Sequence, residues 1–400
     1  MAEKQLKPGW KVWRFDQIAT NVNERVDNPS ESGMEHYVGL EHLDSDSLKI
    51  RRWGSPDDVE ATKLVFRKGD IIFGRRRAYQ RKLGVAEFDG ICSAHAMVLR
   101  AKPDVVLPEF LPFFMQSDVF MNRAVEISVG SLSPTINWKT LAVQEFCLPP
   151  RSEQQRSLRV LTTATHFRES QRDAQLAADT ACRAFLAHSF PAALLGSASY
   201  RTSGPIRKLA ELAEVRTGLA LGRKVAPQKT VSRPYLRVAN VLEGALDLAD
   251  VKTVNVGCDE AQRYELRDGD VLMTEGGDFD KLGRGAVWRG QVSGCLHQNH
   301  VFAVRVDPSV LNPDYLAAMA RSPHGKRYFL SCAKRTSNLA SINKKQLSSF
   351  PVLWAPMRQQ LAIAEQVAAF DLAEVSLRER IMGANELVSG VLNSFVEGWA

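Results

Sequence analysis

The sequence lacks the features of secreted, membrane and zinc-ribbon proteins. Its 6 cysteines lie far apart and form no Cys-x-x-Cys pair, which argues against a disulfide framework or a zinc ribbon. Residues 1–10 have no apolar core of a signal peptide, and His188, Pro191 and Gly196 interrupt the least polar stretch, 184–200. We therefore expect a cytoplasmic protein without a membrane span.

The short motifs of several enzyme classes are also absent. There is no Gly-x-x-x-x-Gly-Lys loop followed by Ser or Thr, no complete Gly-x-Gly-x-x-Gly fingerprint and no Gly-x-Ser-x-Gly nucleophile turn. The Asn-Pro-Pro-Tyr or Asp-Pro-Pro-Tyr tetrapeptide, with which an amino-methyltransferase holds a flipped base, is missing as well. We therefore expect no catalytic residue and no cofactor in this chain.

What remains is the composition of a folded, basic protein with several domains. Hydrophobic residues make up 44% and charged residues 24% of the chain. At about 150 residues per domain, 400 residues indicate two or three domains. Lys and Arg number 52 against 45 Asp and Glu, and the resulting net charge of +7 permits a polyanionic partner without demonstrating one.

The second half of the chain repeats the first. Phe66-Arg-Lys-Gly-Asp-Ile-Ile-Phe73 returns as Leu266-Arg-Asp-Gly-Asp-Val-Leu-Met273, and both predict a turn that leads into a buried strand. Duplication alone explains this symmetry but not why the halves differ so much between the matched segments. The other pairs follow in the same order: 82–84 with 281–283, 94–100 with 299–305, 108–111 with 313–316, 135–141 with 341–347, and Gln154-Gln155 with Gln359-Gln360.

Each half ends in a long predicted helix. Pro149-Pro150 precedes the first helix, Ser152 and Gln155 have capping-box spacing, and neither Pro nor Gly recurs before Pro191. The second helix carries a coiled-coil seam in steps of four and three, broken by one acidic residue: Ile363, Val367, Phe370, Glu374, Leu377, Ile381, Ala384, Val388, Val391 and Phe395. The matching seam of the first helix is rich in alanine: Val160, Ala164, Phe167, Gln171, Ala174, Ala178, Ala181, Phe185 and His188.

The resulting plan is α+β, with two similar globules separated by two long antiparallel helices that form a coiled coil, in pseudo-two-fold symmetry. We assign 1–150 to the first globule, 151–199 to the first helix and hinge, 200–356 to the second globule and 357–400 to the second helix; the hinge is placed at 196–204. At 1.5 Å per residue, ~37 helical residues span roughly 55 Å. The globules should contain short strands such as 235–241 and 301–306, and helices such as 109–116 and 314–321.

Basic clusters are the positive functional signal. One loop of the first half carries five cations and an aromatic residue: Arg75, Arg76, Arg77, Tyr79, Arg81 and Lys82. Arginine binds phosphate or guanine through two parallel hydrogen bonds, and tyrosine can stack or donate to phosphate. Further candidate DNA contacts are Asn137, Lys139, Arg223, Lys224, Lys281, Arg284, Lys334, Arg335, Asn338, Asn343, Lys344 and Lys345. One such cluster could be a solvated basic face, whereas clusters in both halves favour nucleic acid.

Two features of the second half differ from the first. The loop that matches the arginines is Thr274-Glu-Gly-Gly-Asp-Phe-Asp-Lys281, which is acidic and rich in glycine, so the two globules are not expected to read the same surface. Cys295, His297 and His300 could offer three ligands to a metal. Because the counterpart of His300 is His95, which has no second histidine nearby, core or hydrogen-bonded histidines are favoured over a metal site.

Taken together, these segments resemble the specificity subunits of type I restriction-modification systems. The resemblance spans nearly the whole chain and includes the globule starts, Trp10-Lys-Val-Trp-Arg-Phe15 and Ile206-Arg-Lys-Leu209, and the two Gly-Asp strands. Its most specific piece is the start of the first helix, Leu148-Pro-Pro-Arg-Ser-Glu-Gln-Gln155. The second half departs to Ala355-Pro-Met-Arg-Gln-Gln360, which keeps one proline and two glutamines.

The resemblance implies that each globule is a target-recognition domain for half of a bipartite site in double-stranded DNA. The helices would then form a spacer and a dock for two DNA adenine methyltransferase (modification) subunits. S-adenosylmethionine would belong to those subunits, and ATP and Mg to a restriction subunit that translocates and cleaves DNA. Because the two loops differ in charge, the site would be asymmetric, with half-sites about 34–36 Å apart.

Two other functions stay open. A nuclease or methyltransferase with diverged motifs would bind a divalent metal or S-adenosylmethionine by itself. A coiled-coil scaffold for protein interactions would show no salt-sensitive affinity for duplex DNA. The sequence does not separate the restriction role from that of a related subunit in another phage-defence system.

Overall fold

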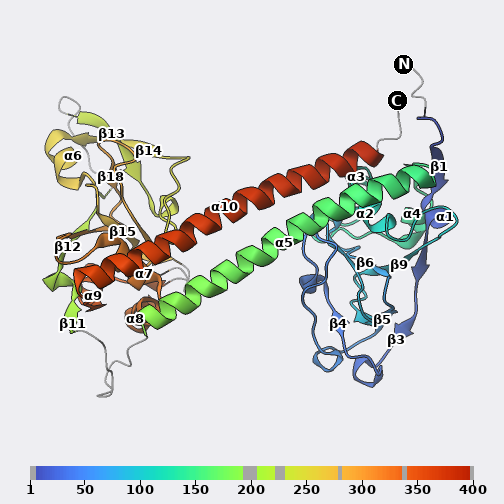
Figure 1. The fold of residues 1–400 in the computed structure, drawn as a ribbon, viewed down its shortest axis with the longest axis horizontal. Helices are drawn as coiled ribbons and strands as arrows, with labels where there is room; N and C mark the ends of the chain where they lie inside the picture. Colours follow the sequence, from blue (N-terminus) through green and yellow to red (C-terminus); the bar gives the residue numbers. More distant parts are fainter. Residues whose placement is uncertain (1–5, 192–204, 221–229, 278–281, 336–339, 397–400) are drawn as a thin grey trace. The chain divides into compact units, whose positions relative to one another are not determined.

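The computed structural model describes residues 6–191, 205–220, 230–277, 282–335 and 340–396, and it forms two compact units (Figure 1). The first unit comprises Met1–Arg172 and Glu379–Ala400, and the second comprises Asp173–Arg378. Both combine helices with several small sheets, so the predicted α+β class is confirmed. The predicted hinge at 196–204 lies outside the described residues.

The first unit is built on two four-stranded sheets and a two-stranded one. One sheet has the order β2-β9-β6-β7, formed by β2 (Ala19–Val22), β9 (Met97–Ala101), β6 (Ile71–Phe73) and β7 (Leu83–Val85). The other has the order β3-β5-β8-β4, formed by β3 (Arg25–Val26), β5 (Lys63–Phe66), β8 (Gly90–Cys92) and β4 (Tyr37–Val38). The pair β1 (Lys11–Arg14) and β10 (Glu145–Leu148) is antiparallel. The helices are α1 (Phe15–Ile18), α2 (Leu111–Gln116), α3 (Asp118–Glu126) and α4 (Trp138–Ala142).

The second unit repeats the main four-stranded sheet and the two-stranded pair of the first, and its other strands form two three-stranded sheets. Its main sheet has the order β12-β19-β15-β17, formed by β12 (Ala213–Thr217), β19 (Val301–Val306), β15 (Val271–Thr274) and β17 (Gly285–Val287). Its smaller sheets are β14-β13-β18 (Lys252–Gly257, Thr230–Leu236, Leu296–His297), β16-β21-β20 (Gly276–Gly277, Ala340–Ser341, Lys334–Arg335) and β11-β22 (Ile206–Lys208, Pro351–Leu353). The helices are α6 (Cys258–Tyr264), α7 (Pro313–Arg321), α8 (Pro323–Cys332) and α9 (Lys344–Ser348). The sequence repeat is therefore a structural repeat.

The repeated Gly-Asp step is a turn held by an arginine from the neighbouring strand. Gly69 and Gly269 have φ of +92° and +86°, a conformation that glycine adopts without a Cβ clash. The buried carboxylate of Asp70 accepts two hydrogen bonds from Arg100, at 2.7 and 2.9 Å. The same two bonds join Arg305 to Asp270, at 2.8 and 2.7 Å. Each turn thereby fixes the start of the strand, β6 or β15, that ends at a candidate site.

The two predicted long helices are α5 (Arg151–Ser189) and α10 (Met357–Val396). Their starts share one device, a buried glutamine that binds the preceding chain. Gln154 accepts from the Leu107 N–H at 2.9 Å and donates to the Pro149 carbonyl at 2.9 Å. Gln360 accepts from the Asn312 N–H at 2.8 Å and donates to the Ala355 carbonyl at 2.7 Å. The structure thus matches Gln154 with Gln360, one residue from the pairing with Gln359 expected from sequence.

The helices pack antiparallel within each unit. In the first unit, Leu161 of α5 and Leu392 of α10 belong to one core cluster. In the second unit, the rings of Phe185 and Phe370 lie 5.9 Å apart. The predicted α10 seam is confirmed, because none of its residues from Ile363 to Val391 is exposed; the side chain of Phe395 is outside the described part.

The predicted seam of α5 is wrong over much of its length. Val160, Phe167, Ala174, Ala181 and His188 are exposed. The buried positions of α5 in the first unit include Leu161, Ala164, Thr165, Arg168 and Glu169. A charged pair in the core breaks the apolar period on which the prediction depended.

Arg168 and Glu169 tie α5 to the first unit. Glu169 forms ion pairs with Arg168 at 3.4 Å, with Arg172 at 3.6 Å and, closest of all, with Arg51 of a loop in the globule. The Arg168 side chain is only 3% exposed, and burial together with the charge of Arg172 lowers its pKa to about 10. The carboxylate of Glu169 therefore serves three guanidinium groups at the junction of helix and globule.

Candidate nucleic-acid interface

The arginine loop of the first unit leaves the end of β6 and is braced by a hairpin at 129–135. The Ile136 N–H donates to the Arg75 carbonyl at 3.0 Å, and the Arg77 N–H donates to the Pro134 carbonyl at 2.7 Å. Arg77 has a positive φ of 59°, which turns the chain into the short 3-10 helix η4 (Ala78–Gln80). Sequence reasoning placed the arginines in one loop but did not connect them to this hairpin.

The side chains of the three consecutive arginines contact neutral groups. Arg75 donates to the Ala94 carbonyl at 3.0 Å, and Arg76 contacts His95 at 3.3 Å. Arg76 and Arg77 each donate to the Ser133 hydroxyl at 3.3 Å. In the described part of the chain, no carboxylate pairs with any of the three guanidinium groups. Their charges therefore stay available to an anion.

His95 is a neutral neighbour of these arginines. Burial, followed by the charges of Arg76 and Arg75, lowers the pKa of His95 below its usual value of 6.5. The imidazole therefore remains unprotonated at neutral pH, and its neutral ring can lie beside a guanidinium without adding a positive charge.

The other three predicted residues of this loop divide into two groups. Tyr79 is 54% exposed, as a stacking or phosphate-binding side chain would be. Arg81 is held inside the unit, because it pairs with Asp46 at 2.6 Å and with Asp118 at 2.9 Å. Lys82 donates to the Leu40 carbonyl at 2.7 Å. The contacts of Arg81 and Lys82 anchor the loop to its surroundings.

The second unit presents the same backbone with the opposite charge. Glu275 takes the position of Arg75, because its carbonyl accepts from the Ile342 N–H at 2.8 Å as that of Arg75 accepts from Ile136. Its carboxylate lies 2.5 Å from His300, the counterpart of His95. One frame thus carries an arginine and a histidine in one unit, and a glutamate and a histidine in the other.

The remaining predicted contact residues of the second unit lie in the segments that precede and follow this frame along the chain. Lys334 lies in β20, which pairs with β21 beside β16, and Lys344 and Lys345 begin α9; all three side chains are exposed. Asn343 caps α9, because its side chain accepts from the Gln346 N–H at 2.9 Å. Arg284 is half-buried, and its Nε is buried with no hydrogen-bond partner among the described residues.

In the first unit, Asn137 and Lys139 occupy the matching place, and both are exposed. Asn137 stands at the start of α4 without capping it through its side chain. Four predicted contact residues lie outside the described part of the chain: Arg223, Lys224, Lys281 and Asn338. For Arg335, the structure describes the backbone but not the side chain.

The Cys295, His297 and His300 group does not assemble. His297 is buried, its Nδ1 lies 2.7 Å from the Val301 carbonyl, and burial lowers its pKa to about 4. His300 is exposed and faces Glu275 instead. Across the described residues, no group of His, Cys, Asp and Glu could hold a metal ion.

A cleft lined by both polar and apolar side chains adjoins the arginine loop in the first unit. It has a volume of about 340 Å³. Arg25, Lys63 and Arg75 line it together with Asn21, Asn23, Thr62 and Trp138, and no carboxylate does. The Nε of Arg75 is buried and has no hydrogen-bond partner in the described part. The cleft therefore extends the cationic character of the loop.

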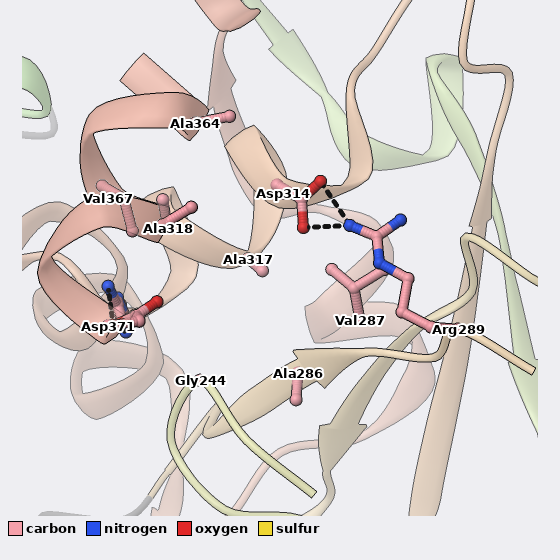
Figure 2. Close-up of a pocket in the computed structure, with 12 residues that line it drawn as sticks. Gly244, Ala286, Val287, Arg289, Asp314, Ala317, Ala318, Ala364, Val367 and Asp371 are labelled. Atoms are coloured by element: carbon pink, nitrogen blue, oxygen red, sulfur yellow. Dashed lines mark hydrogen bonds and ion pairs between the residues drawn. The ribbon is translucent and has the colours of Figure 1, made fainter. Parts of the chain in front are cut away.

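A pocket of about 240 Å³ in the second unit has a different character (Figure 2). Figure 2 shows Ala318 of α7 beside Val367 of α10. Its charges are already paired, Arg289 with Asp314 at 2.5 Å and Arg321 with Asp371 at 2.9 Å. The Arg321–Asp371 pair attaches α7 to α10, and the Arg289–Asp314 pair attaches the chain after β17 to α7. Among the described residues that line this pocket, no cation is left free for a nucleic acid.

Comparison with known proteins shows which chains are similar to this one. Residues 10–177 match the model of the type I restriction modification DNA specificity domain. Over most of its length the chain is similar to type I restriction-enzyme specificity subunits.

Relatives and solved structures extend the match beyond the first unit. The EcoKI specificity subunit of Escherichia coli is 24% identical over 374 residues, which cover 89% of this chain and 77% of that protein. The EcoDI specificity subunit of Escherichia coli is 29% identical over 152 residues, 38% of this chain and 33% of that one. The fold is shared with an S subunit from M. genitalium, with a TM-score of 0.58 at 12% identity over 99% and 98% of the two chains. A chain from a structural study of type I R-M complex assembly has a TM-score of 0.56 at 20% identity, and the match covers 99% of this chain and 100% of that one.

No helix among the described residues is both long enough and apolar enough to cross a membrane.

Proposed function

We propose that this chain is the DNA-reading subunit of a type I restriction-modification complex in the cytoplasm. In this role, each unit contacts one half of a bipartite site in double-stranded DNA. Modification subunits, and a restriction subunit where one is present, supply S-adenosylmethionine, ATP and Mg chemistry. The chain itself selects the site and contributes no catalytic residue.

One observation carries the proposal: a common frame presents unlike side chains in the two units. The arginine loop follows β6, and Glu275 with two glycines follows β15 at the same hydrogen-bonded position. Two copies of a DNA-reading unit that differ at the same loop would favour different base sequences. The expected site is therefore asymmetric.

The proposed contacts divide by chemistry. Phosphates attract cations and set the salt dependence, whereas base edges are read by paired hydrogen bonds worth about 1–3 kcal/mol each. The first unit would use the cations and polar groups of its loop and of α4, and the second those around β20 and α9. The proposed contact residues are Arg75, Arg76, Arg77, Tyr79, Asn137 and Lys139, then Arg223, Lys224, Lys281, Arg284, Lys334, Arg335, Asn338, Asn343, Lys344 and Lys345. Arg81 and Lys82 would hold the loop in place.

The long helices are the proposed dock for two modification subunits and the spacer between half-sites. Both helices carry exposed apolar side chains, which a partner helix could cover: Val160, Phe167 and Leu176 on α5, and Leu361, Leu372, Val375, Met382 and Leu387 on α10. In the proposed complex, the length of the helices sets the number of base pairs between the half-sites.

The test compares the chain alone with the chain co-expressed with its neighbouring reading frames. We expect the complex to bind duplex DNA with an affinity that falls steeply with salt, and the chain alone to show no methylation or cleavage. A chain that elutes free of DNA and has no salt-sensitive affinity would be a protein scaffold. A chain that binds S-adenosylmethionine or a divalent metal by itself would be an enzyme with diverged motifs.

A further inference from the structure

The hairpin that braces the arginine loop has an unusual apolar tip. Val129 and Thr135 exchange backbone hydrogen bonds at 3.1 and 3.0 Å, and Gly130, with φ of +118°, turns the chain between them. Leu132 at the tip is 90% exposed and Val129 is 74% exposed. These are the two most exposed large hydrophobic side chains in the described part of the chain.

The tip is tied to the cations that the proposed function assigns to DNA. Ser133, next to Leu132, accepts hydrogen bonds from both Arg76 and Arg77. The Pro134 carbonyl accepts from the Arg77 N–H, and Thr135 bridges to Arg76. An anion bound by Arg76 and Arg77 would therefore lie near the hairpin tip that carries Leu132.

This juxtaposition has a physical use in DNA recognition. A single exposed apolar side chain is ordinary. Here Leu132 and Val129 lie on one short hairpin beside guanidinium groups that have no carboxylate partner among the described residues, and they form an apolar point within a cationic surface. The fold itself gains nothing from their exposure, because neither side chain belongs to a core cluster. DNA offers the matching arrangement: charged phosphates outside, and apolar base faces and thymine methyl groups within the grooves.

We propose that Leu132, supported by Val129, contacts the bases of the half-site that the first unit reads while Arg76 and Arg77 hold the adjacent phosphates. This inference rests on the proposed function and goes beyond it in naming an apolar specificity determinant. The contact involves no charge, so it adds to sequence preference without adding to the salt dependence of binding. Charge complementarity favours DNA over a protein as the occupant of this tip.

The experiment is a selection from a pool of randomised duplexes by the complex of this chain with its co-expressed partner subunits. The wild-type complex should enrich one bipartite sequence. With Leu132→Ala, we expect weaker enrichment within one half-site, no change in the other, and an affinity for the wild-type sequence that falls about tenfold. The slope of affinity against salt should stay the same. Leu132→Met, which keeps an apolar side chain of similar size, should restore most of the preference.

Two control variants separate this inference from the proposed function. Arg77→Ala should lower the salt slope and weaken binding to all sequences, whereas Val125→Ala, an exposed apolar position on α3 of the same unit, should change neither. If the wild-type complex enriches no sequence, the proposed function fails and the inference fails with it. If a bipartite sequence appears and Leu132→Ala selects it with unchanged affinity, the inference alone is overturned. Loss of co-purifying subunits with unchanged DNA preference would assign the tip to a protein partner and also overturn it.

Discussion

Replacing Arg75, Arg76 and Arg77 by alanine should flatten the salt dependence of DNA binding without unfolding the first unit. The three guanidinium groups contact a carbonyl, a histidine and a hydroxyl, and no described carboxylate would lose its partner in the variant. Each phosphate contact contributes about −0.9 to the slope of log affinity against log salt, so three contacts contribute about −2.7.

Over a fourfold rise in salt, that difference in slope corresponds to a factor of about 40 in affinity. The triple variant should therefore bind much more weakly than wild type at low salt and approach it as salt rises. Fluorescence anisotropy of a labelled duplex, titrated with the complex at several salt concentrations, measures both slopes. Arg123→Ala is the matched control, because Arg123 is an exposed cation of the same unit that pairs with Glu126 at 3.1 Å. An unchanged slope in the triple variant would remove this loop from the interface.

Three further predictions test the frame. Asp270→Asn should destabilise the second unit by about 3 kcal/mol, because it leaves the guanidinium of Arg305, which is only 19% exposed, without its counter-charge. Asp70→Asn should cost the first unit less, because Arg100 is 52% exposed and water can solvate it. Hydrogen exchange in each unit measures both losses of stability, and equal losses would refute this prediction. The pKa of His297 is about 4 in the fold and about 6.5 in the unfolded chain, so the free energy of unfolding should fall by up to about 3 kcal/mol as the pH drops from 6.5 to 4. Urea unfolding at several pH values should show that His297→Gln lacks this part of the pH dependence. The same pH profile in wild type and variant would refute the prediction. Inserting one heptad in both α5 and α10 lengthens each helix by about 10 Å, so the tolerated spacer should grow by about three base pairs while both half-sites stay unchanged. Sequencing the modified sites measures the spacer, and a spacer of unchanged length would exclude the helices as its determinant.

The repeat and the helices could be predicted because their signals are local and strong. The Gly-Asp step needs a positive φ and a buried carboxylate, so it survives in both halves and marks equivalent strands. The α10 seam is regular because its buried residues are mostly apolar. The strand at 301–306 and the helix predicted at 314–321 follow from the same kind of pattern.

The α5 seam could not be read in the same way. The buried pair Arg168 and Glu169 occupies positions that an apolar period assigns to solvent. Its partner Arg51 lies on a loop more than a hundred residues earlier in the chain. A charge is buried only where the fold supplies its counter-charge, and that pairing is a property of tertiary structure. The register of Gln360 was missed for a related reason, since its role lies in bonds to Asn312 and Ala355.

The candidate interface shows the same limit. Composition grouped Arg81 and Lys82 with the three arginines before them, but only the fold shows that Arg81 binds Asp46 and Asp118. Nor does sequence spacing bring Ser133 to Arg76, because 57 residues separate them in the chain. The contacts of Ser133 and Pro134 with the arginine loop therefore could not be predicted from the sequence.

The most direct test of the account is to sequence the modified bases of a genome in a host that expresses this chain with its neighbouring reading frames. We expect methylation at one bipartite sequence with two unlike halves, and we expect it to disappear when this chain is deleted. Methylation that persists without the chain, or that falls on a palindromic site, would contradict the claim that two unlike units select the DNA.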